Sequence, residues 1–445
     1  MKRACFMSKT NAGETVYIGM TADIMHHGLI KVIEAGRQHG PVTIGLLTDK
    51  AVSRYKPLPY LDYGQRKCIL ENIVGVAQVV PQDDWDFVPN LLNYKPAVMV
   101  HGDDWTEGPQ RLFRPRAIEA MGQWGGRLIE VPDTKGVSTA RYKQQLNGLG
   151  NTSEIRRGAL RRHLDTDLLV KAMEVHSPLC GRLVETLAVE TNDGIGRFQA
   201  MWASSLTDSS VRGKPDIELV DTSIRINSVD ALFEVTTKPL IFDGDTGGLP
   251  EHFAFNVRTL ERLGASAIII EDKTGPKRNS LLKGEGQHIQ EDMNLFAKKI
   301  SVGKDASVTD DFMIIGRIES LIIGSGMDDA LRRAEAYTEA GADGIMIHSR
   351  SPSPAEVMEF CDRFRDRDPD TVLVVVPTKY NTVYDSELKA HGANVVIYAN
   401  HMLRASLPAM KDVCSSILKY GRSKEADEMC LPVDELLELI PDRVL

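Results

Sequence analysis

Short apolar runs recur through the second part of the chain, and each is followed by a stretch long enough for a helix. The runs do not alternate with polar residues, which is typical of strands buried on both faces of a parallel sheet. Repeated strand–helix units over residues 165–428 fit a (β/α)8 barrel. We predict barrel strands at 200–203, 240–242, 267–270, 313–316, 344–347, 372–376 and 395–398.

The first 145 residues show the same alternation on a smaller scale. A helical pattern near 29–33 follows the first apolar run, and further runs come later. Strands that alternate with helices predict a small parallel sheet covered on both faces, the Rossmann-like architecture of nucleotide-binding domains. The predicted strands are 16–19, 42–47, 97–100 and 127–131.

A change of character separates the two blocks. Residues 147–151 read as a turn-rich break, and 154–162 are rich in arginine and helix formers. We therefore predict an α/β protein with a Rossmann-like domain at 1–145, a partly helical linker at 146–168 and a barrel at 169–428. An acidic tail with a terminal helix is predicted at 429–445.

Composition narrows the class of protein. A chain of 445 residues is too long for one ordinary core, and its net charge of −9 argues against general affinity for nucleic acid or anionic membranes. The six cysteines form no Cys-x-x-Cys pair, so neither a zinc site nor a disulfide framework is indicated. The chain has neither a signal-peptide pattern nor an apolar run of membrane-span length, and we expect a cytoplasmic protein.

Polar residues follow the predicted barrel strands, where barrel enzymes build their sites. Asp243 and Asp245 come directly after one strand, and Glu271 ends the next. Three carboxylates at one barrel mouth suit a hard divalent cation such as Mg²⁺. An isolated Asp-Gly-Asp is more often a polar turn. Here Arg317 and His348 follow on successive strands, which favours the metal interpretation.

A loop after Glu271 is unusually basic. Gly275 and Pro276 prevent regular structure, and Lys277, Arg278 and Asn279 follow at once. These side chains suit a lid over a bound anion. By itself such a loop would be read as a solvated basic segment.

Taken in order, these motifs resemble the phosphoenolpyruvate mutase/isocitrate lyase superfamily. The matching segments are Asp243–Gly247, Glu271–Lys273 with Lys277, Asn279 and Ser280, Arg317 with Glu319, and His348 with Ser349. The resemblance covers roughly residues 165–420. The KKCGH motif of isocitrate lyases is missing, and the lid is similar to the mutase branch. The lid of phosphonopyruvate hydrolase, the nearest sister, differs.

The resemblance implies a role for each residue. Asp243 would bind Mg²⁺ directly, and Asp216, Asp245 and Glu271 would act largely through water. Segment Ser204, Ser205 and Leu206 would hold the enolate or carboxylate oxygens. The phosphoryl contacts would be Arg317 and His348, beside Asp216, and the gating lid would be Lys277, Asn279 and Ser280.

The implied chemistry moves PO3 from the enol oxygen to C3 of the same molecule through a loose, metaphosphate-like transition state. Such a site stabilises an enolate, holds PO3 with cations and excludes water. A leaky lid would instead give pyruvate and phosphate. Whether Asp216 positions the phosphoryl group or accepts it transiently stays open.

Three segments of the first block are similar to the signatures of cytidylyltransferases such as those of glycerol 3-phosphate and phosphocholine. They begin at His26, His101 and Thr134, and the first lies at a helix start that suits a phosphate. The implied nucleotide contacts are His26, His27, Gly28, His101, Asp103, Asp104, Ser138 and Thr139, and Lys56 is a further candidate cation with Lys50 and Arg66. Each of these three cations reads equally well as surface charge.

Two positions depart from the cytidylyltransferase pattern. Leu29 stands at the second histidine of the HxGH signature, and Asp133 replaces an arginine of the third motif. Losing a group that stabilises the transferring phosphate can cost several kcal/mol of transition-state stabilisation. The neighbouring His27 is a candidate replacement.

The fusion of the two blocks resembles the bifunctional enzymes of phosphonate biosynthesis, including those of the fosfomycin pathway. The resemblance implies CTP as co-substrate with Mg²⁺, and a phosphonate acceptor such as 2-hydroxyethylphosphonate or 2-aminoethylphosphonate. It further implies a homo-oligomer that exchanges its last barrel helix, and coupling to a phosphonopyruvate decarboxylase. The alternatives are a degenerate, non-catalytic first domain and a hydrolase or lyase barrel, against which the lid argues.

Overall fold

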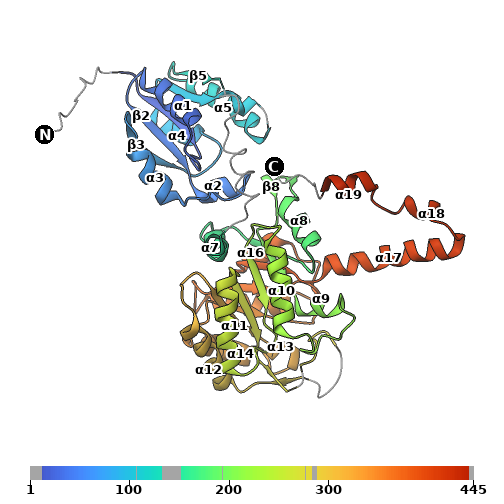
Figure 1. Cartoon of the computed structure of the whole chain (residues 1–445). Helices are drawn as coiled ribbons and strands as arrows, with labels where there is room; N and C mark the ends of the chain where they lie inside the picture. The colour runs from blue at the N-terminus through green and yellow to red at the C-terminus, as the bar shows by residue number, and fades with distance from the viewer. Residues whose placement is uncertain are drawn as a thin grey trace, which may run out of the picture. The chain divides into compact units, whose positions relative to one another are not determined.

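The computed structural model describes residues 13–106, 108–132, 152–192, 194–275, 277–282 and 288–439 (Figure 1). The chain divides into two compact units. The first comprises Met1–Leu146 with Ala188–Gly196, and the second comprises Asn147–Leu187 with Arg197–Leu445. Each unit is described by itself below.

The first unit holds a five-stranded parallel sheet in the order β3-β2-β1-β4-β5. This order is the Rossmann-like arrangement that the sequence predicted. The strands are β1 (Val16–Met20), β2 (Val42–Leu47), β3 (Val76–Gln82), β4 (Val98–Gly102) and β5 (Arg127–Val131). The helices are α1 (His27–Arg37), α2 (Asp49–Ser53), α3 (Tyr63–Glu71), α4 (Val88–Tyr94) and α5 (Phe113–Gly122), with 3-10 turns η1 (Asp103–Thr106) and η2 (Gly108–Leu112).

Two hydrophobic clusters cover the two faces of this sheet. Successive strand side chains point to opposite faces, so Val16 and Ile18 join one cluster with α1 and α3 while Tyr17 joins the other with α4 and α5. Close approach requires glycine at position 19, because a Cβ there would lie 2.2 Å from the Phe87 ring. The carboxyl ends of β1 and β4 are neighbours, which brings together the first two cytidylyltransferase-like segments.

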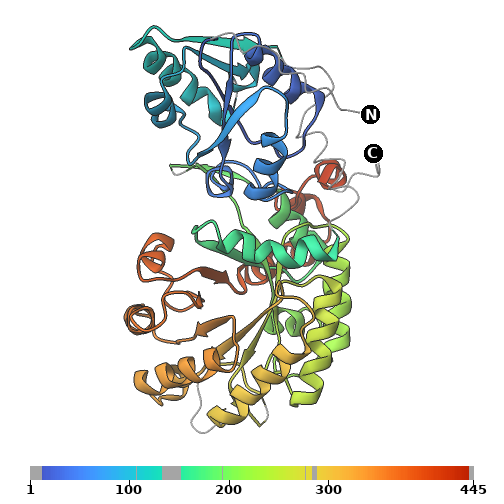
Figure 2. The same ribbon diagram turned by 90° about the vertical axis from the view of Figure 1, so that its left-hand side faces the viewer.

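The second unit is a closed barrel of eight parallel strands, so the (β/α)8 prediction is confirmed. Helices surround the strands (Figure 2). An inner apolar cluster fills the barrel, and a larger cluster lies between strands and helices. The strands are β6 (Val170–Glu174), β9 (Ala200–Ala203), β10 (Leu240–Asp243), β11 (Ala267–Glu271), β14 (Met313–Ile318), β15 (Gly344–Ile347), β16 (Val372–Val375) and β17 (Val395–Tyr398). Strand β6 was missing from the sequence prediction.

The outer helices of the barrel are α8 (Pro178–Thr186), α9 (Ser205–Ser210), α10 (Thr222–Phe233), α11 (Pro250–Leu263), α12 (Met293–Ala306), α13 (Ser320–Ile323), α14 (Met327–Glu339), α15 (Ala355–Arg365) and α16 (Asp385–Ala390). A short hairpin of β12 (Lys273–Thr274) with β13 (Ile289–Gln290) belongs to the barrel unit, whereas the hairpin of β7 (Val189–Thr191) with β8 (Gly194–Gly196) belongs to the first unit.

Helix α7 (Ser153–Leu164) closes the amino end of the barrel, in the segment predicted as a linker. Leu160 is buried in the inner cluster. The arginines of α7 bind backbone carbonyls and carboxylates of the barrel. Arg156 Nη2 donates to Phe233 O at 3.2 Å and Thr236 O at 2.7 Å, and Arg161 Nη2 donates to Asp343 Oδ1 at 2.7 Å. The described part of the segment therefore belongs physically to the barrel.

Helix α17 (His401–Tyr420) runs away from the barrel wall (Figure 1) and has no buried residue. The tail continues through α18 (Lys424–Asp427) to α19 (Val433–Leu439), the terminal helix that the sequence predicted. Among the described residues, no helix has both the length and the apolar character needed to cross a membrane.

Candidate active site

A pocket at the carboxyl end of the barrel strands gathers the residues singled out in the sequence. Parallel pairing places Glu271 of β11 opposite Arg317 of β14, and Asp243 ends the neighbouring β10. Of the predicted barrel residues, all but Asp245 line this pocket. The lining is Trp202, Ser204, Ser205, Leu206, Asp216, Asp243, Glu271, Lys277, Asn279, Ser280, Leu281, Arg317, Met346, His348, Val376, Thr378, Ala399 and Asn400.

Lys277 of the predicted lid lies at the centre of the carboxylates. Its ammonium donates to Ser205 Oγ at 2.8 Å, to Asp216 Oδ1 at 2.9 Å and to Asp245 Oδ1. Burial alone would lower the pKa of Lys277, but the surrounding carboxylates, Asp245 first, raise it above its ordinary value. Asn279 Nδ2 donates to Asp216 Oδ2 at 2.6 Å. The lid segment therefore lies over Asp216.

Asp243 is held by the turn that follows β9. Its Oδ2 accepts hydrogen bonds from Ser205 N at 3.0 Å and Ser205 Oγ at 2.9 Å, and its Oδ1 accepts one from Asp245 N at 3.2 Å. Burial would raise the pKa of Asp243, but Lys277, Arg225 and Arg317 hold it below the ordinary range. Asp243 is therefore an anion fixed at the pocket wall.

Asp245 is fixed from behind by a buried arginine. Arg225 of α10 donates through Nη1 to Asp245 Oδ2 at 2.8 Å and through Nε to Asp208 Oδ2 at 3.0 Å. Asp245 has a positive φ of 53°, which is uncommon for a residue with a Cβ. The Arg225 contact and the turn together aim the other oxygen of Asp245 at Lys277.

These oxygens are chemically suited to Mg²⁺. Among the described residues, no three carboxylate, imidazole or thiolate groups form a direct metal cage. Magnesium seldom needs one, because it is usually bound by one or two carboxylates and several waters. Within the described part of the chain, the buried Glu271 Oε1 accepts no hydrogen bond, although it lies 3.4 Å from Lys273 Nζ, so it can still accept from a bound water. The carboxylates of Asp243, Asp245 and Glu271 therefore offer the oxygen donors that Mg²⁺ prefers.

The opposite wall of the pocket carries the guanidinium of Arg317, which is paired with Glu271 and Glu319. Arg317 Nη2 lies 2.7 Å from His348 Nδ1, and Arg317 Nη1 lies 3.3 Å from Glu271 Oε2. Burial first, and then the charge of Arg317, lower the pKa of His348 to about 4. His348 is therefore neutral near pH 7, and Arg317 carries the positive charge at this wall.

In the first unit, the histidine segment occupies the turn between β1 and α1. His26 caps the helix, with its Nδ1 accepting from Leu29 N at 3.4 Å, while His27 is exposed and Gly28 lies in the first turn. Ala22, in the preceding turn, has a positive φ of 51°. Strained backbone of this kind clusters at functional sites. The turn between β1 and α1 therefore combines an uncommon backbone conformation at Ala22 with the helix cap at His26.

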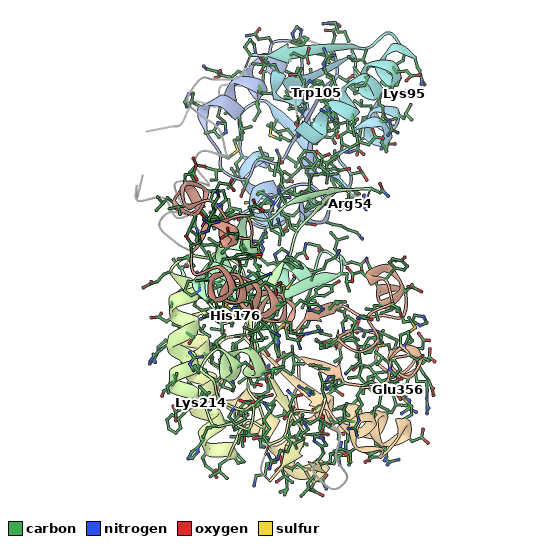
Figure 3. All side chains as sticks on the ribbon, turned by 90° about the vertical axis from the view of Figure 1, so that its right-hand side faces the viewer. Arg54, Lys95, Trp105, His176, Lys214 and Glu356 are labelled. Atoms are coloured by element: carbon green, nitrogen blue, oxygen red, sulfur yellow. The ribbon has the colours of Figure 1, made fainter. Side chains whose placement is uncertain are left out.

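His101 lies against an aromatic cluster at the end of β4. Its ring stacks on Trp105 with centroids 4.0 Å apart, and its Nδ1 lies 2.8 Å from Gly102 O. Trp105, labelled in Figure 3, donates to Glu130 Oε1 at 2.7 Å. Two hydrogen bonds from Arg114 to Glu130 lower the pKa of that carboxyl to about 2 and fix the arrangement.

The remaining predicted nucleotide contacts are placed unequally. Asp103 and Asp104 lie in η1 just after β4, and Lys56 Nζ lies 5.0 Å from the centre of the Trp85 ring. Arg66 is fully buried and donates to Leu47 O at 3.0 Å, to Asp49 Oδ1 at 2.6 Å and to Thr21 O. These contacts make Arg66 a structural cation and correct its prediction as a candidate triphosphate cation. Asp133, Ser138 and Thr139 lie outside the described residues.

Comparison with known proteins decides the family. A sequence-family profile for phosphoenolpyruvate phosphomutase matches residues 160–418, and one for cytidylyltransferase-like domains matches 17–145. The chain belongs to the phosphoenolpyruvate phosphomutase family. It is an enzyme of the phosphomutase type that carries a cytidylyltransferase-like domain.

Individual relatives cover the barrel part. Phosphonopyruvate hydrolase of Variovorax sp. is 36% identical over 64% of this chain and 94% of its own length. Phosphoenolpyruvate phosphomutase of Tetrahymena pyriformis is 35% identical over 60% and 85%. A crystal structure of phosphoenolpyruvate phosphomutase from Streptomyces platensis subsp. rosaceus superposes with a TM-score of 0.58, at 34% identity over 65% of this chain and 95% of the other. Identity alone does not separate mutase from hydrolase.

Several pocket residues were missed by sequence reasoning. Thr378 follows β16, so its position after a predicted strand was the available signal, whereas Asn400 after β17 was recognisable as a polar residue at a strand end but was given no role. Trp202 lines the pocket with a buried Nε1 that has no acceptor within the described residues. No sequence pattern marks Trp202, because an aromatic residue inside a buried strand reads as core.

Proposed function

We propose that the barrel interconverts phosphoenolpyruvate and phosphonopyruvate. The observation that carries the proposal is that one pocket gathers the carboxylates of Asp216, Asp243 and Glu271 with the guanidinium of Arg317, while Asn279 of the lid is hydrogen-bonded to Asp216. In the reaction the bond between phosphorus and the enol oxygen breaks, and a bond between phosphorus and C3 forms. The substrate and product are isomers, so no proton or water enters the balance.

The residues divide the work by charge. Arg317 and His348 would hold the PO3 group, because a fixed guanidinium beside a neutral imidazole offers hydrogen bonds to its oxygens. Asp243, with Asp216, Asp245 and Glu271 through water, would hold Mg²⁺, and segment 204–206 would orient the carboxylate end of the substrate. When bound, Mg²⁺ would supply positive charge that stabilises the enolate.

The lid decides the product in this proposal. Lys277 and Asn279 bridge the lid to Asp216, and Ser280 is only 2% exposed. Excluding water from a metaphosphate-like transition state prevents hydrolysis to pyruvate and phosphate. Both a mutase and a hydrolase are among the relatives, so similarity does not decide between the two reactions. The hydrogen bond from Asn279 to Asp216 keeps the lid over the pocket, which favours the mutase reaction.

A direct test is to incubate the protein with phosphonopyruvate and Mg²⁺ and to follow phosphorus NMR. Formation of phosphoenolpyruvate supports the proposal. Pyruvate and phosphate as the main products would mean that the barrel is a hydrolase. Chelation of the metal with EDTA should abolish either activity, and added Mg²⁺ should restore it.

For the first unit we propose transfer of CMP from CTP to a phosphonate such as 2-hydroxyethylphosphonate, with release of pyrophosphate. The match to cytidylyltransferase-like domains and the capped start of α1 after β1 support it. Helix starts offer backbone N–H groups to phosphate. A phosphonate oxygen would attack the α-phosphorus of CTP in line, without a covalent enzyme intermediate.

A non-catalytic first domain is the alternative that specific observations favour. Leu29 stands where the signature has its second histidine, and the His101 ring packs on Trp105. Phosphorus NMR with CTP, Mg²⁺ and either 2-hydroxyethylphosphonate or 2-aminoethylphosphonate separates the two. A CMP-phosphonate signal supports transfer. Its absence in both tubes, followed by its appearance in Leu29→His, would establish a degenerate site.

We also propose that the protein is a homo-oligomer that exchanges α17 between subunits. Apolar residues recur along α17 at intervals of three and four, at Leu407, Met410, Cys414 and Ile417, and all four are exposed. That spacing forms a stripe on one helix face, which a partner subunit would cover. A phosphonopyruvate decarboxylase is the functional partner we expect, because it would consume the mutase product.

A further inference from the structure

The carboxylate of Glu319 connects Ser280 of the lid to Arg317 and His348, the two residues proposed to hold the PO3 group. Glu319 follows β14 and is fully buried. Its Oε1 accepts from Arg317 Nε at 2.7 Å and lies 3.3 Å from His348 Nδ1. Its Oε2 accepts from Ser280 Oγ at 2.6 Å and lies 3.1 Å from Lys273 Nζ. The two oxygens thus face two different parts of the site.

Ser280 closes this arrangement from the lid side. Its hydroxyl donates to Glu319 and accepts from Arg317 Nη2 at 2.8 Å and from Lys273 Nζ. Moving the lid away would remove one partner from each of these three side chains at once. Buried charged groups that lose partners are costly, so an open lid and a correctly held Arg317 disfavour each other.

Asp272, which follows the last residue of β11, fixes the base of the lid. Lys273 and Gln290 are paired across the β12–β13 hairpin, on either side of the lid. Gln290 donates to Asp272 Oδ2 at 2.9 Å, and Asp272 Oδ1 accepts from Glu319 N at 2.9 Å. Lys273 and Gln290 are therefore both tied to the turn that carries Glu319, and Ser280 contacts Glu319 itself from the lid.

We propose that Glu319 is a positioning residue that couples closure of the lid to the orientation of Arg317, with Ser280 as the latch. The proposal rests on the mutase function proposed above and assigns Glu319 no contact with the substrate. It orients Arg317 for PO3 only when Ser280 is in place, so the transferring group and the water-excluding lid are assembled together. Isomerisation without hydrolysis requires that water is already excluded when the PO3 group is held for transfer.

The test uses Glu319→Gln, Ser280→Ala and the double variant, with Glu359→Gln of the exposed Glu359–Arg363 pair as control. Removing partners that orient a functional residue typically costs about 10- to 100-fold in activity. We expect a loss of that size in kcat/KM for phosphonopyruvate in Glu319→Gln, and a several-fold rise in the share of pyruvate among the products. Ser280→Ala should raise the pyruvate share with a smaller loss.

Two further readouts separate coupling from general damage. If Glu319→Gln and Ser280→Ala break the same contact, the double variant should lose no more activity than Glu319→Gln alone, because the effects of coupled residues are not additive. Mg²⁺ with oxalate should protect the exposed Arg278 bond from trypsin in the wild type and control but not in Glu319→Gln. Ser280→Ala removes a single hydroxyl, so it keeps the test informative if Glu319→Gln unfolds.

The outcomes distinguish the inference from the proposed function. Wild-type product ratios and trypsin protection in Glu319→Gln and Ser280→Ala would overturn the latch, as would additive losses in the double variant. If the wild-type protein itself forms no phosphoenolpyruvate from phosphonopyruvate, the mutase proposal fails instead. Trypsin protection by Mg²⁺ and oxalate can still be compared among the variants in that case.

Discussion

Replacing Arg156 by methionine removes a guanidinium that ties helix α7 to the base of the barrel. Arg156 is 3% exposed, and its Nη2 is shared between the carbonyl oxygens of Phe233, the last residue of α10, and Thr236, which follows the helix. The guanidinium also lies 3.9 Å from the centre of the Phe233 ring. Burial lowers the pKa of Arg156 to about 10, so it stays charged at neutral pH.

The expected cost follows from the two carbonyls. Each buried acceptor left without a partner costs about 1–3 kcal/mol. The methionine side chain recovers part of the packing on Phe233, and burying a charge has its own desolvation cost that the variant avoids. We expect Arg156→Met to lower the free energy of unfolding of the barrel by about 2–4 kcal/mol, within the range of severe single substitutions. Arg156→Lys should lose less.

Urea unfolding, followed by circular dichroism and by loss of mutase activity, measures this change. Glu154→Gln, on the exposed side of the same helix, is the matched control and should unfold like the wild type. A midpoint for Arg156→Met equal to that of the control would refute the reasoning. It would mean that α7 is a connector that merely lies on the barrel.

Three further predictions concern the lid, the oligomer and pH. Asn279→Ala loses a hydrogen bond to the Asp216 carboxylate, worth about 1.5–3 kcal/mol, so kcat/KM measured on phosphonopyruvate should fall roughly 10- to 150-fold. Met410→Glu, in the apolar stripe of α17, should shift the mass measured by light scattering toward a smaller assembly, whereas Ala405→Glu on the opposite face should not. Because burial lowers the pKa of His348 to about 4, only the unfolded chain takes up this proton between about pH 6.5 and 4. The free energy of unfolding should therefore fall on acidification through that window, and less steeply in His348→Asn, as measured by denaturant titration.

The strands that the sequence predicted are those with continuous apolar runs. Strand β6 escaped because its apolar and polar residues do not match its buried positions: Glu174 is buried, whereas Met173 is only partly buried. Strand β3 lies at the sheet edge, contains Pro81 and has three exposed residues. Both patterns read as loop in a single sequence. Their neighbours in the sheet, which no local pattern reveals, determine that they are strands.

The site could be predicted as a set of residues but not as a network. Polar positions after strands placed Asp243, Glu271 and Arg317 at one barrel mouth, because parallel strands end together. Glu319 stood beside Arg317 in the same motif without a role, since its contacts with Ser280 and Lys273 depend on how the loop folds back. Arg66 reads as a surface cation in the sequence, and only the fold shows it bound to backbone carbonyls.

The charged groups of the pocket are arranged so that hydrolysis and isomerisation would share one set of binding residues. Asp243, Glu271 and Arg317 lie on strand ends or beside them and are held by neighbours in the barrel wall. The lid residues reach the same groups from a loop, through Lys277 on Asp216 and Ser280 on Glu319. A rigid wall cannot choose between C3 and water as the phosphoryl acceptor once both are within reach. In the proposed mechanism that choice depends on closure of the lid, so a hydrolase that is 36% identical and a mutase that is 35% identical to this chain can share the same wall residues.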